Sequence, residues 1–397
     1  MAKRDLTMEQ QLARGPLDLP FLMLTVLLTV IGVIMVFSAS FATAVYEERS
    51  ATYYFARQAL FAVMGLAAMY VTSKINYQRF RWMSIFALGL AFFLLVIVLI
   101  PGVHTNRADG VKRWIRVPGL GTFQPSEMAK MGVTLYFAAR MSKRQSEKKR
   151  EYDRRTYSGV ILNWLDDIGF MELVPYGAIL LAIMVLMRLE PHMSGTILIL
   201  VPAAAILFAG GIKLRWFAMG GALVGGFLAL FITGYQSTRI LVWQDPWAYP
   251  QHGGYQIIQS LYAIGSGGLF GVGFGQSRQK QLFLPEPEND FIFSIACEEL
   301  GLIGAGLILA LFVMLILRGY WIALHARDRF GSLLAVGITT LLAVQVFLNI
   351  SVVTNFLPTT GISLPFFSYG GTALMIQLVE MGIVLSVSRQ IPVTKQG

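Results

Sequence analysis

Residues 291–317 read FIFSIACEELGLIGAGLILALFVMLIL, a run of mostly apolar side chains that only two charged residues, Glu298 and Glu299, interrupt. A helix needs about 20 predominantly apolar residues to cross the hydrocarbon core of a bilayer, and this run is longer. It therefore predicts a transmembrane helix. Carboxylates inside a membrane span are costly unless they face a cavity or a partner, so we expect Glu298 and Glu299 to do so.

Nine further apolar runs lie along the chain. The run at 126–142 carries Glu127 and Lys130 in its first turns, and the run at 58–73 is short. A transmembrane β-barrel would need alternating strands of about ten residues, whereas these runs are continuous. The sequence thus predicts an all-α polytopic membrane protein with spans at 19–40, 58–73, 82–100, 126–142, 171–188, 194–210, 215–233, 291–317, 332–356 and 369–388.

The composition points the same way. Hydrophobic residues are 55% of the 397 residues and charged residues only 14%, whereas a soluble domain carries about 25% charged residues. The single cysteine, Cys297, excludes an intramolecular disulfide and a cysteine-based metal cluster. The four histidines lie far apart and form no HExxH pair, which argues against a zinc or haem site. We expect residues 1–397 to form one membrane domain.

Lysine and arginine set the predicted orientation, because they are enriched in cytoplasmic connections. With the N-terminus inside, 21 of the 32 fall in cytoplasmic segments, including a tail at 1–18 and a basic loop at 143–170. The even number of spans returns the C-terminus to the cytoplasm. The net charge of +10 is then mostly a topology signal, reinforced by attraction to anionic lipid, and requires no nucleic-acid ligand.

The outer connection at 101–125 breaks this charge pattern. It carries Arg107, Lys112, Arg113 and Arg116 on the side where positive charge is disfavoured. Some interaction other than topology must offset this placement. An anionic lipid headgroup is the obvious candidate.

Residues 234–290 form the one long outer segment of the prediction. Long loops are usually functional or disordered, and disorder fits poorly because this segment is rich in aromatic residues and glycine. The apolar spacing within 256–264 predicts a short amphipathic helix that lies in the membrane interface. The glycines between 265 and 275 allow close approach of backbone to a ligand, but they match no dinucleotide-binding pattern.

The same segment ends with Glu286, Glu288 and Asp290, directly before the apolar run at 291–317. Asp290 has two interpretations: an N-cap of the following helix, or a functional carboxylate near the outer membrane face. Together with Glu298, Glu299 and the basic residues of neighbouring outer segments, these carboxylates predict a polar pocket that opens to the outside.

A second polar stretch, 355–372, connects the last two spans. It contains Asn355, Pro358, Pro365 and several glycines, and it has no charged residue. One interpretation is a simple connector rich in proline and glycine. The other is a re-entrant segment that lines the pocket, which a membrane allows only where protein or water satisfies the backbone.

Several of these strings, taken together and in order, resemble the SEDS family of bacterial cell-wall polymerases. The match runs from the first span through the last, and ten spans with both termini inside fit that family. The strings VFSAS at 36–40 and GxSxQK, which ends at Lys280, resemble the FtsW and SpoVE branches, FtsW above all, more than RodA. The motifs that carry the resemblance are GVKRWI (110–115), QPSExxK (124–130), GYQxxQSLxAIGSGGxxGxGxGxSxQK (254–280), LPExxxDFIF (284–293), EELG (298–301) and LPxTGIxLPFxSYGG (357–371).

The resemblance implies a peptidoglycan glycosyltransferase that polymerises lipid II into β-1,4-linked glycan at the outer face of the cytoplasmic membrane, in cell division. It also implies that Asp290 is the catalytic general base, which deprotonates the acceptor 4-hydroxyl as this attacks the anomeric carbon. Attack opposite an α-linked pyrophosphate gives a β bond in one displacement. The family usually has His-Thr before this aspartate, where this chain has Glu288 and Asn289.

Pyrophosphate can leave without protonation where cations or a metal absorb its charge. The expected cations are Arg57, Lys112, Arg113, Lys130, Arg239 and Lys280. The residues expected to line the pocket are Glu127, Gln256, Gln259, Ser260, Glu286, Glu299, Ser368 and Tyr369. A divalent cation, Mg²⁺ or Mn²⁺, is the one cofactor that this chemistry leaves open, and no ligands are assigned to it.

By the same resemblance the chain works in a complex with a class B penicillin-binding protein, a transpeptidase, and with other division proteins at the septum. The spans at 291–317 and 332–356 are its expected neighbours. The expected substrates are lipid II and glycan linked to undecaprenyl pyrophosphate.

Two other functions stay open at this point. A flippase for the lipid-linked precursor would suit ten spans and the intramembrane Glu298 and Glu299, although transporters often have an internal repeat and none is evident here. A division scaffold without catalysis would suit the charged loop and the basic N-terminal tail. A pure scaffold would need neither Asp290 nor cations on the outer side. No polar path to the cytoplasmic face, which a flippase needs, is evident, because the ionisable residues gather on the outer side.

Overall fold

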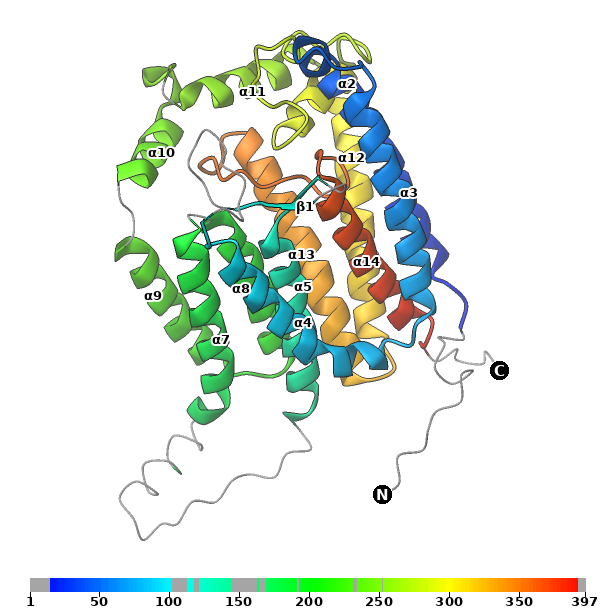
Figure 1. Ribbon diagram of the computed structural model, residues 1–397, viewed down its shortest axis with the longest axis vertical. Coiled ribbons are helices and arrows are strands. Elements are labelled where there is room, and N and C mark those ends of the chain that lie inside the picture. The colour runs from blue at the N-terminus through cyan, green and yellow to red at the C-terminus, as the bar shows by residue number, and fades with distance from the viewer. Residues whose placement is uncertain are drawn as a thin grey trace.

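The computed structural model describes residues 15–101, 113–117, 121–144, 163, 169–190, 193–230, 234–251 and 253–391. Within them, one long helix corresponds to each predicted span (Figure 1). These helices are α2 (Leu19–Tyr46), α3 (Tyr53–Lys74), α4 (Gln78–Ile97), α5 (Pro125–Ser142), α7 (Phe170–Leu189), α8 (Met193–Ala209), α9 (Leu214–Leu230), α12 (Ile292–Leu324), α13 (Arg329–Val353) and α14 (Gly371–Ser388).

Seven of the described helices are long and apolar enough to cross a membrane, and α8 is a shorter apolar helix. Large hydrophobic side chains remain exposed along the outer helices, as Leu60, Phe86 and Leu307 do. Such faces suit lipid rather than water. The chain is an all-helical, multi-pass membrane protein, as the sequence predicts.

The helix α13 lies at the centre of the bundle (Figure 1). It packs against α5, α8, α12 and α14. Of its most apolar stretch, 72% is buried, compared with 28% for α3 and α4 and 22% for α7. A helix that is surrounded on all sides needs apolar or internally satisfied side chains around its whole circumference. Most polar side chains on α13, Asn349 among them, are therefore held within the protein.

The segments predicted to be cytoplasmic meet at one end of the bundle. Gly15 donates a backbone hydrogen bond to the carbonyl of Arg389 at 2.9 Å, which joins the two ends of the described chain. Asp18 caps α2 by accepting from the backbone N–H of Phe21, and it pairs with Arg318 at 2.8 Å. The structure thus brings together the connections that the charge pattern assigned to one side.

Several helices extend beyond the predicted apolar runs. The helix α2 continues to Tyr46, where the prediction ends at residue 40, and α12 continues to Leu324, where the prediction ends at 317. A helix can continue beyond the membrane, because its backbone hydrogen bonds form in water as well as in lipid. The apolar run marks only the part of the helix whose side chains face lipid. In α12 the added turns begin with Arg318, which pairs with Asp18.

The outer end of the bundle carries the short elements. The strands β1 (Ile115–Val117) and β2 (Gly121–Phe123) form an antiparallel pair, which the sequence analysis did not anticipate. The helices α10 (Gly234–Gln244), η2 (Pro246–Ala248) and α11 (Gly254–Ser266) lie across this end (Figure 1). The helix α11 confirms the predicted amphipathic helix.

A break in α12 receives the glycine-rich loop that follows α11. Gly301 has φ 68°, and a Cβ there would lie 2.2 Å from the backbone nitrogen of Gly271. Val272 donates its backbone N–H to the carbonyl of Glu298 at 2.9 Å across this contact. Glycine is needed at such points because it accepts positive φ and has no Cβ. Gly271 therefore serves loop-to-helix packing, and approach of the other loop glycines to a ligand stays a prediction.

The connection between α13 and α14 enters the bundle. Phe366 stacks on Phe312 of α12, with 6.3 Å between the ring centroids. Its carbonyl oxygen lies 2.3 Å from where a Cβ on Gly32, in the middle of α2, would be. The chain can descend to this depth because protein surrounds its backbone. The structure confirms the re-entrant interpretation of 355–372.

Candidate active site

A cavity of about 900 Å³ opens at the outer end of the bundle; we call it the outer cavity. Its wall comes from α2, α3, α5, α10, the segment 282–291, the re-entrant connection and the start of α14. The wall carries both acidic and basic side chains. Nine of the predicted site residues line it: Arg57, Arg113, Glu127, Arg239, Gln256, Glu286, Asp290, Ser368 and Tyr369.

Asp290 lies in the turn that leads into α12. The N-cap position of α12 belongs to Phe291, and no side-chain cap hydrogen bond occurs there among the described residues. The N-cap interpretation of Asp290 is therefore wrong. The carboxylate instead faces the re-entrant connection, where its Oδ2 lies 3.4 Å from the position that a Cβ on Gly361 would occupy. Gly361 has φ 69°, so glycine both permits this turn and leaves room beside the carboxylate.

Asn349, near the C-terminal end of α13, fixes the backbone on both sides of this contact. Its amide nitrogen donates to the carbonyl of Asp290 at 2.8 Å and to the carbonyl of Ile362 at 2.7 Å. One buried side chain thus ties the turn before α12 to the re-entrant connection. A carboxylate held in this way is preorganised, which is what a reacting group requires.

Glu288 brings a second carboxylate into the cavity wall, two residues before Asp290. Only 4% of this residue is exposed. Its carboxylate accepts from the hydroxyl of Thr43 at 3.4 Å, and its backbone carbonyl accepts from the N–H of Tyr369 at 2.8 Å. Burial raises the pKa of the Glu288 carboxyl to about 7, and the charge of Glu286 acts in the same direction. Glu288 therefore titrates near neutral pH.

Three arginines from separate elements supply the positive charge of the cavity wall. On α10, Arg239 donates to the carbonyl of Thr359 at 2.9 Å. On α3, Arg57 donates to the hydroxyl of Tyr53 at 2.8 Å. Arg113, just before β1, donates to the carbonyl of Glu190 at 3.4 Å. Guanidinium groups on several sides of one cavity suit a ligand with several anionic oxygens.

The pair of Glu127 and Lys130 lies at the start of α5. The Lys130 ammonium contacts the Glu127 carboxylate at 2.7 Å, and both side chains are buried. Glu127 reaches the cavity wall, whereas Lys130 does not. Lys130 therefore does not line the cavity as predicted; only its partner Glu127 does.

Lys280 and Glu299 lie outside the outer cavity. The Lys280 ammonium contacts the Glu299 carboxylate at 2.7 Å and the Ser38 hydroxyl at 2.9 Å, in a buried site between α2 and α12. A cation neutralised by a buried carboxylate has little charge left for pyrophosphate. This geometry corrects the prediction that Lys280 binds pyrophosphate and that Glu299 lines the pocket.

Ser260 and Gln259, both on α11, do not belong to the cavity wall either. The Ser260 hydroxyl contacts the Ser294 hydroxyl and the carbonyl of Val353, each at 2.7 Å, so it ties α11 to α12 and α13. Gln256, one turn earlier, does line the cavity. Lys112 lies outside the described residues, as does most of the basic loop 143–170 and most of the tail 1–18.

Comparison with known proteins identifies the family of this chain. A family model described as FtsW/RodA/SpoVE cell cycle protein matches residues 19–392. The chain belongs to that family. Two relatives are each 41% identical to it over 374 residues: "Probable peptidoglycan glycosyltransferase FtsW" of Geobacter metallireducens, covering 94% of both chains, and "Stage V sporulation protein E" of Bacillus subtilis, covering 94% of this chain and 97% of the relative. The resemblance to the SEDS family is confirmed.

Solved structures of this FtsW/RodA/SpoVE family share the fold. A chain of a peptidoglycan synthase complex, in work on the structural coordination of polymerization and crosslinking, superposes with a TM-score of 0.72 at 25% identity, over 96% of this chain and 99% of that one. The rod shape determining protein RodA of Thermus thermophilus gives a TM-score of 0.64 at 24% identity, over 94% and 97%. The fold of this chain is thus that of RodA.

Several residues of the cavity wall are not among the site residues that the sequence predicts. Glu47 and Thr43 come from the outer end of α2, and Gln377 from α14. Asn349 lies behind the wall, on α13. A sequence signal exists for Asn349 and Gln377, because each is a polar residue within an apolar span, and such residues face a cavity or a partner. Glu47 and Thr43 carry no comparable signal.

Proposed function

We propose that this chain is a peptidoglycan glycosyltransferase that polymerises lipid II into β-1,4-linked glycan at the outer face of the cytoplasmic membrane. The enzyme class comes from the relatives that share its length and its motifs. The observation that carries the proposal is the position of Asp290: a carboxylate with a fixed backbone, in an outer cavity that three arginines border. A carboxylate that can take a proton, beside several guanidinium groups, matches what glycosyl transfer from a pyrophosphate donor requires.

Asp290 acts as the general base. Its carboxylate accepts the proton of the acceptor 4-hydroxyl while that oxygen forms a bond to the anomeric carbon of the donor sugar. The bond between the anomeric carbon and the pyrophosphate oxygen breaks in the same displacement. Attack from the opposite face converts an α-linked donor into a β-linked product. Hydrolytic enzymes use a second carboxyl group to protonate the leaving oxygen, but pyrophosphate leaves as an anion.

Arg57, Arg113 and Arg239 bind the pyrophosphate and stabilise the charge that develops on it. Lys112, next to Arg113 in the sequence, contributes in the same way. Positive charge in the outer connection 101–125 opposes the charge rule for membrane topology, and binding an anionic headgroup accounts for it. The lipid tails remain in the bilayer, beside a cavity that lies at the outer end of the spans.

A divalent cation, Mg²⁺ or Mn²⁺, would bind together with the pyrophosphate. Within the described residues, no three histidine, cysteine, aspartate or glutamate side chains gather into a metal site. Mg²⁺ is commonly held through substrate phosphates and few protein ligands. The ion would add positive charge at the leaving group, and the arginines would position that group.

The proposal includes a partner and a place. A class B penicillin-binding protein crosslinks the new strand, and α12 and α13 are the helices that we expect beside it. One relative structure belongs to a peptidoglycan synthase complex. We expect the complex to act at the division septum, because FtsW proteins are among the similar relatives. A sporulation role, as in the Bacillus relative's name, is the alternative.

The test is polymerisation of purified lipid II by the wild-type protein and by Asp290→Asn, each with and without its penicillin-binding partner carrying an inactivated transpeptidase. Loss of a general base lowers the rate by about 10²- to 10⁴-fold, so the variant should form almost no glycan while it elutes as the wild type does in gel filtration. Near-normal polymerisation by the variant would refute the role of Asp290. If the wild type made no glycan under any condition, lipid scrambling in liposomes would test the flippase alternative, and a negative result there would leave a scaffold.

A further inference from the structure

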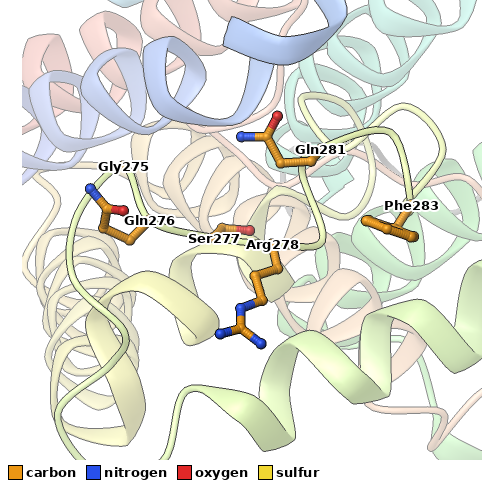
Figure 2. A pocket seen from close by; sticks show the side chains of 6 residues that line it. All are labelled: Gly275, Gln276, Ser277, Arg278, Gln281 and Phe283. Carbon is orange, nitrogen blue, oxygen red and sulfur yellow. The ribbon is translucent and has the colours of Figure 1, made fainter.

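A second, smaller hollow of about 360 Å³ lies on the surface of the outer segment; we call it the loop hollow. Its lining comes from one stretch of chain between α11 and α12 (Figure 2). The lining residues are Gly275, Gln276, Ser277, Arg278, Gln281 and Phe283. None of them belongs to the wall of the outer cavity.

The floor of the loop hollow is held from below by the two carboxylates of α12. Glu298 accepts from the backbone N–H of Arg278 at 3.0 Å and of Gln279 at 3.3 Å, and also from the hydroxyl of Ser277. Glu299 accepts from the backbone N–H of Ser277 at 3.4 Å. Hydrogen bonds to carboxylates are stronger than those between neutral groups. This exposed loop is therefore fixed in shape by buried charge.

Several side chains that line the loop hollow are available to a ligand. Gln276, Arg278 and Gln281 are exposed, and their side chains form no hydrogen bond or ion pair with any residue that the structure describes. Phe283 beside them is 53% exposed. Each glutamine amide offers donors and an acceptor, and arginine offers a planar set of donors for a carboxylate. Amides with an aromatic face suit sugar hydroxyl and N-acetyl groups; the guanidinium suits a peptide carboxylate.

The loop hollow shares a wall with the outer cavity. Gln281 and Phe283 line the loop hollow, whereas Leu282 and Leu284 line the outer cavity. Side chains in this stretch thus alternate between the two spaces, and a single strand of backbone separates them. Leu282 has φ 64°, a conformation that a leucine adopts only at an energetic cost. A polymer that leaves the outer cavity across this wall arrives at the loop hollow.

We propose that the loop hollow is a saccharide subsite that binds the glycan strand outside the outer cavity. Gln276 and Gln281 bind hydroxyl and N-acetyl groups, Phe283 packs against a sugar face, and Arg278 pairs with a carboxylate of the stem peptide. The subsite retains the strand between successive additions, so it governs product length. This inference rests on the proposed polymerase function for its biological meaning, but sugar binding can be measured without activity.

The first arm of the test measures binding with the full-length Asp290→Asn protein in detergent micelles. The probe is a soluble tetramer of β-1,4-linked N-acetylglucosamine, followed by saturation-transfer NMR. Gln281→Ala loses a hydrogen bond and Phe283→Ala loses the ring that packs against a sugar face, so each should lower the affinity by about threefold to tenfold. Gln251→Ala and Phe270→Ala are the matched controls, because both residues are exposed on the same outer segment outside either space.

The second arm measures product length from lipid II in the active protein. Phe283→Ala and Gln281→Ala should shorten the glycan strands seen by gel electrophoresis, and the two control variants should give wild-type lengths. Unchanged probe affinity and unchanged lengths would overturn the proposal. It is also overturned if the variants keep their probe affinity but lose co-purification with the penicillin-binding protein, since the hollow would then be a protein contact.

The two arms separate this inference from the proposed function. Were wild-type protein to form no glycan at all, the polymerase proposal would fail, while the binding arm would still decide whether the loop hollow holds a saccharide. A variant that misfolds is recognised by its elution in gel filtration. Gln276→Ala then replaces it as a second lining variant, with the same expected loss of affinity.

Discussion

Asn349 holds the backbone of Asp290 from behind, through a hydrogen bond of 2.8 Å from its side-chain amide to the Asp290 carbonyl. The same amide reaches the carbonyl of Ile362 in the re-entrant connection at 2.7 Å. A buried side chain near the end of α13 thus sets the position of the turn that carries a carboxylate of the outer cavity. The packing of the core therefore helps to determine the geometry of the candidate site.

Replacing Asn349 should reduce catalysis more than it reduces substrate binding. Asn349→Leu removes two hydrogen bonds, each of about 0.5–1.5 kcal/mol, and releases the turn that carries Asp290. We expect kcat for glycan polymerisation to fall about tenfold, with little change in KM. The matched control is Gln345→Leu, one turn earlier on α13, because Gln345 bonds to Ser363 and does not contact Asp290. Equal losses in both variants would mean that only the packing of α13 matters.

Removing a cavity arginine should weaken recognition of the pyrophosphate. Arg239→Gln keeps a polar side chain of similar length but removes the charge, so kcat/KM for lipid II should fall by about tenfold. The measurement is initial polymerisation rate against lipid II concentration. Arg215→Gln, at the exposed end of α9 away from the cavity wall, is the control and should retain the wild-type value. Lys112→Gln tests in the same assay the residue that lies outside the described ranges.

The buried carboxyl of Glu288 should make stability depend on pH near neutrality. Its pKa in the folded protein is raised from 4.5 to about 7, so folding favours its protonated form. The stabilisation is complete below a pH of about 4.5 and is lost as the pH rises through about 7. Thermal unfolding midpoints in detergent should therefore fall for the wild type over this range, and fall less for Glu288→Gln, which stays neutral. The exposed Glu48→Gln should follow the wild type, because Glu48 is not among the charges that act on Glu288, and identical curves for all three proteins would contradict the assignment.

The buried pair of Lys280 and Glu299 should be structural, and its loss should be costly. Removing one partner of a buried ion pair leaves an uncompensated charge and costs about 3–5 kcal/mol. Glu299→Gln and Lys280→Met should each lower the unfolding midpoint sharply, and the double variant should recover part of the loss because no lone charge remains. The exposed pair of Arg49 and Glu47 supplies the control, since such surface pairs contribute about 0–1 kcal/mol. Full stability of the single variants would show that the pair has no structural role.

At α12 the sequence predicted correctly that two carboxylates have partners, but it placed Glu299 in the outer pocket, where it does not lie. Glu298 and Glu299 are two carboxylates in an apolar span, and that pattern predicts a cavity or a partner. Both do have partners, but these are a lysine, two serines and the backbone of the outer loop rather than a ligand. The cost of burying a charge is the same for either kind of partner, so the sequence pattern cannot distinguish them. Lys280 is predicted to bind pyrophosphate because it lies in an outer segment, and that position does not reveal its carboxylate partner.

The sequence by itself determined the ten spans, their grouping into two sides and the family. These follow from the length of apolar runs, the placement of basic residues and ordered motifs, all of which are local properties of the chain. Only the tertiary structure decided which polar side chains share a space: that Asp290 faces the re-entrant connection, that Glu288 is buried beside Thr43, and that Lys280 is neutralised by Glu299. Whether a charge meets solvent, substrate or an opposite charge depends on contacts between residues from about twenty to more than two hundred positions apart, and no periodicity along the chain records those contacts.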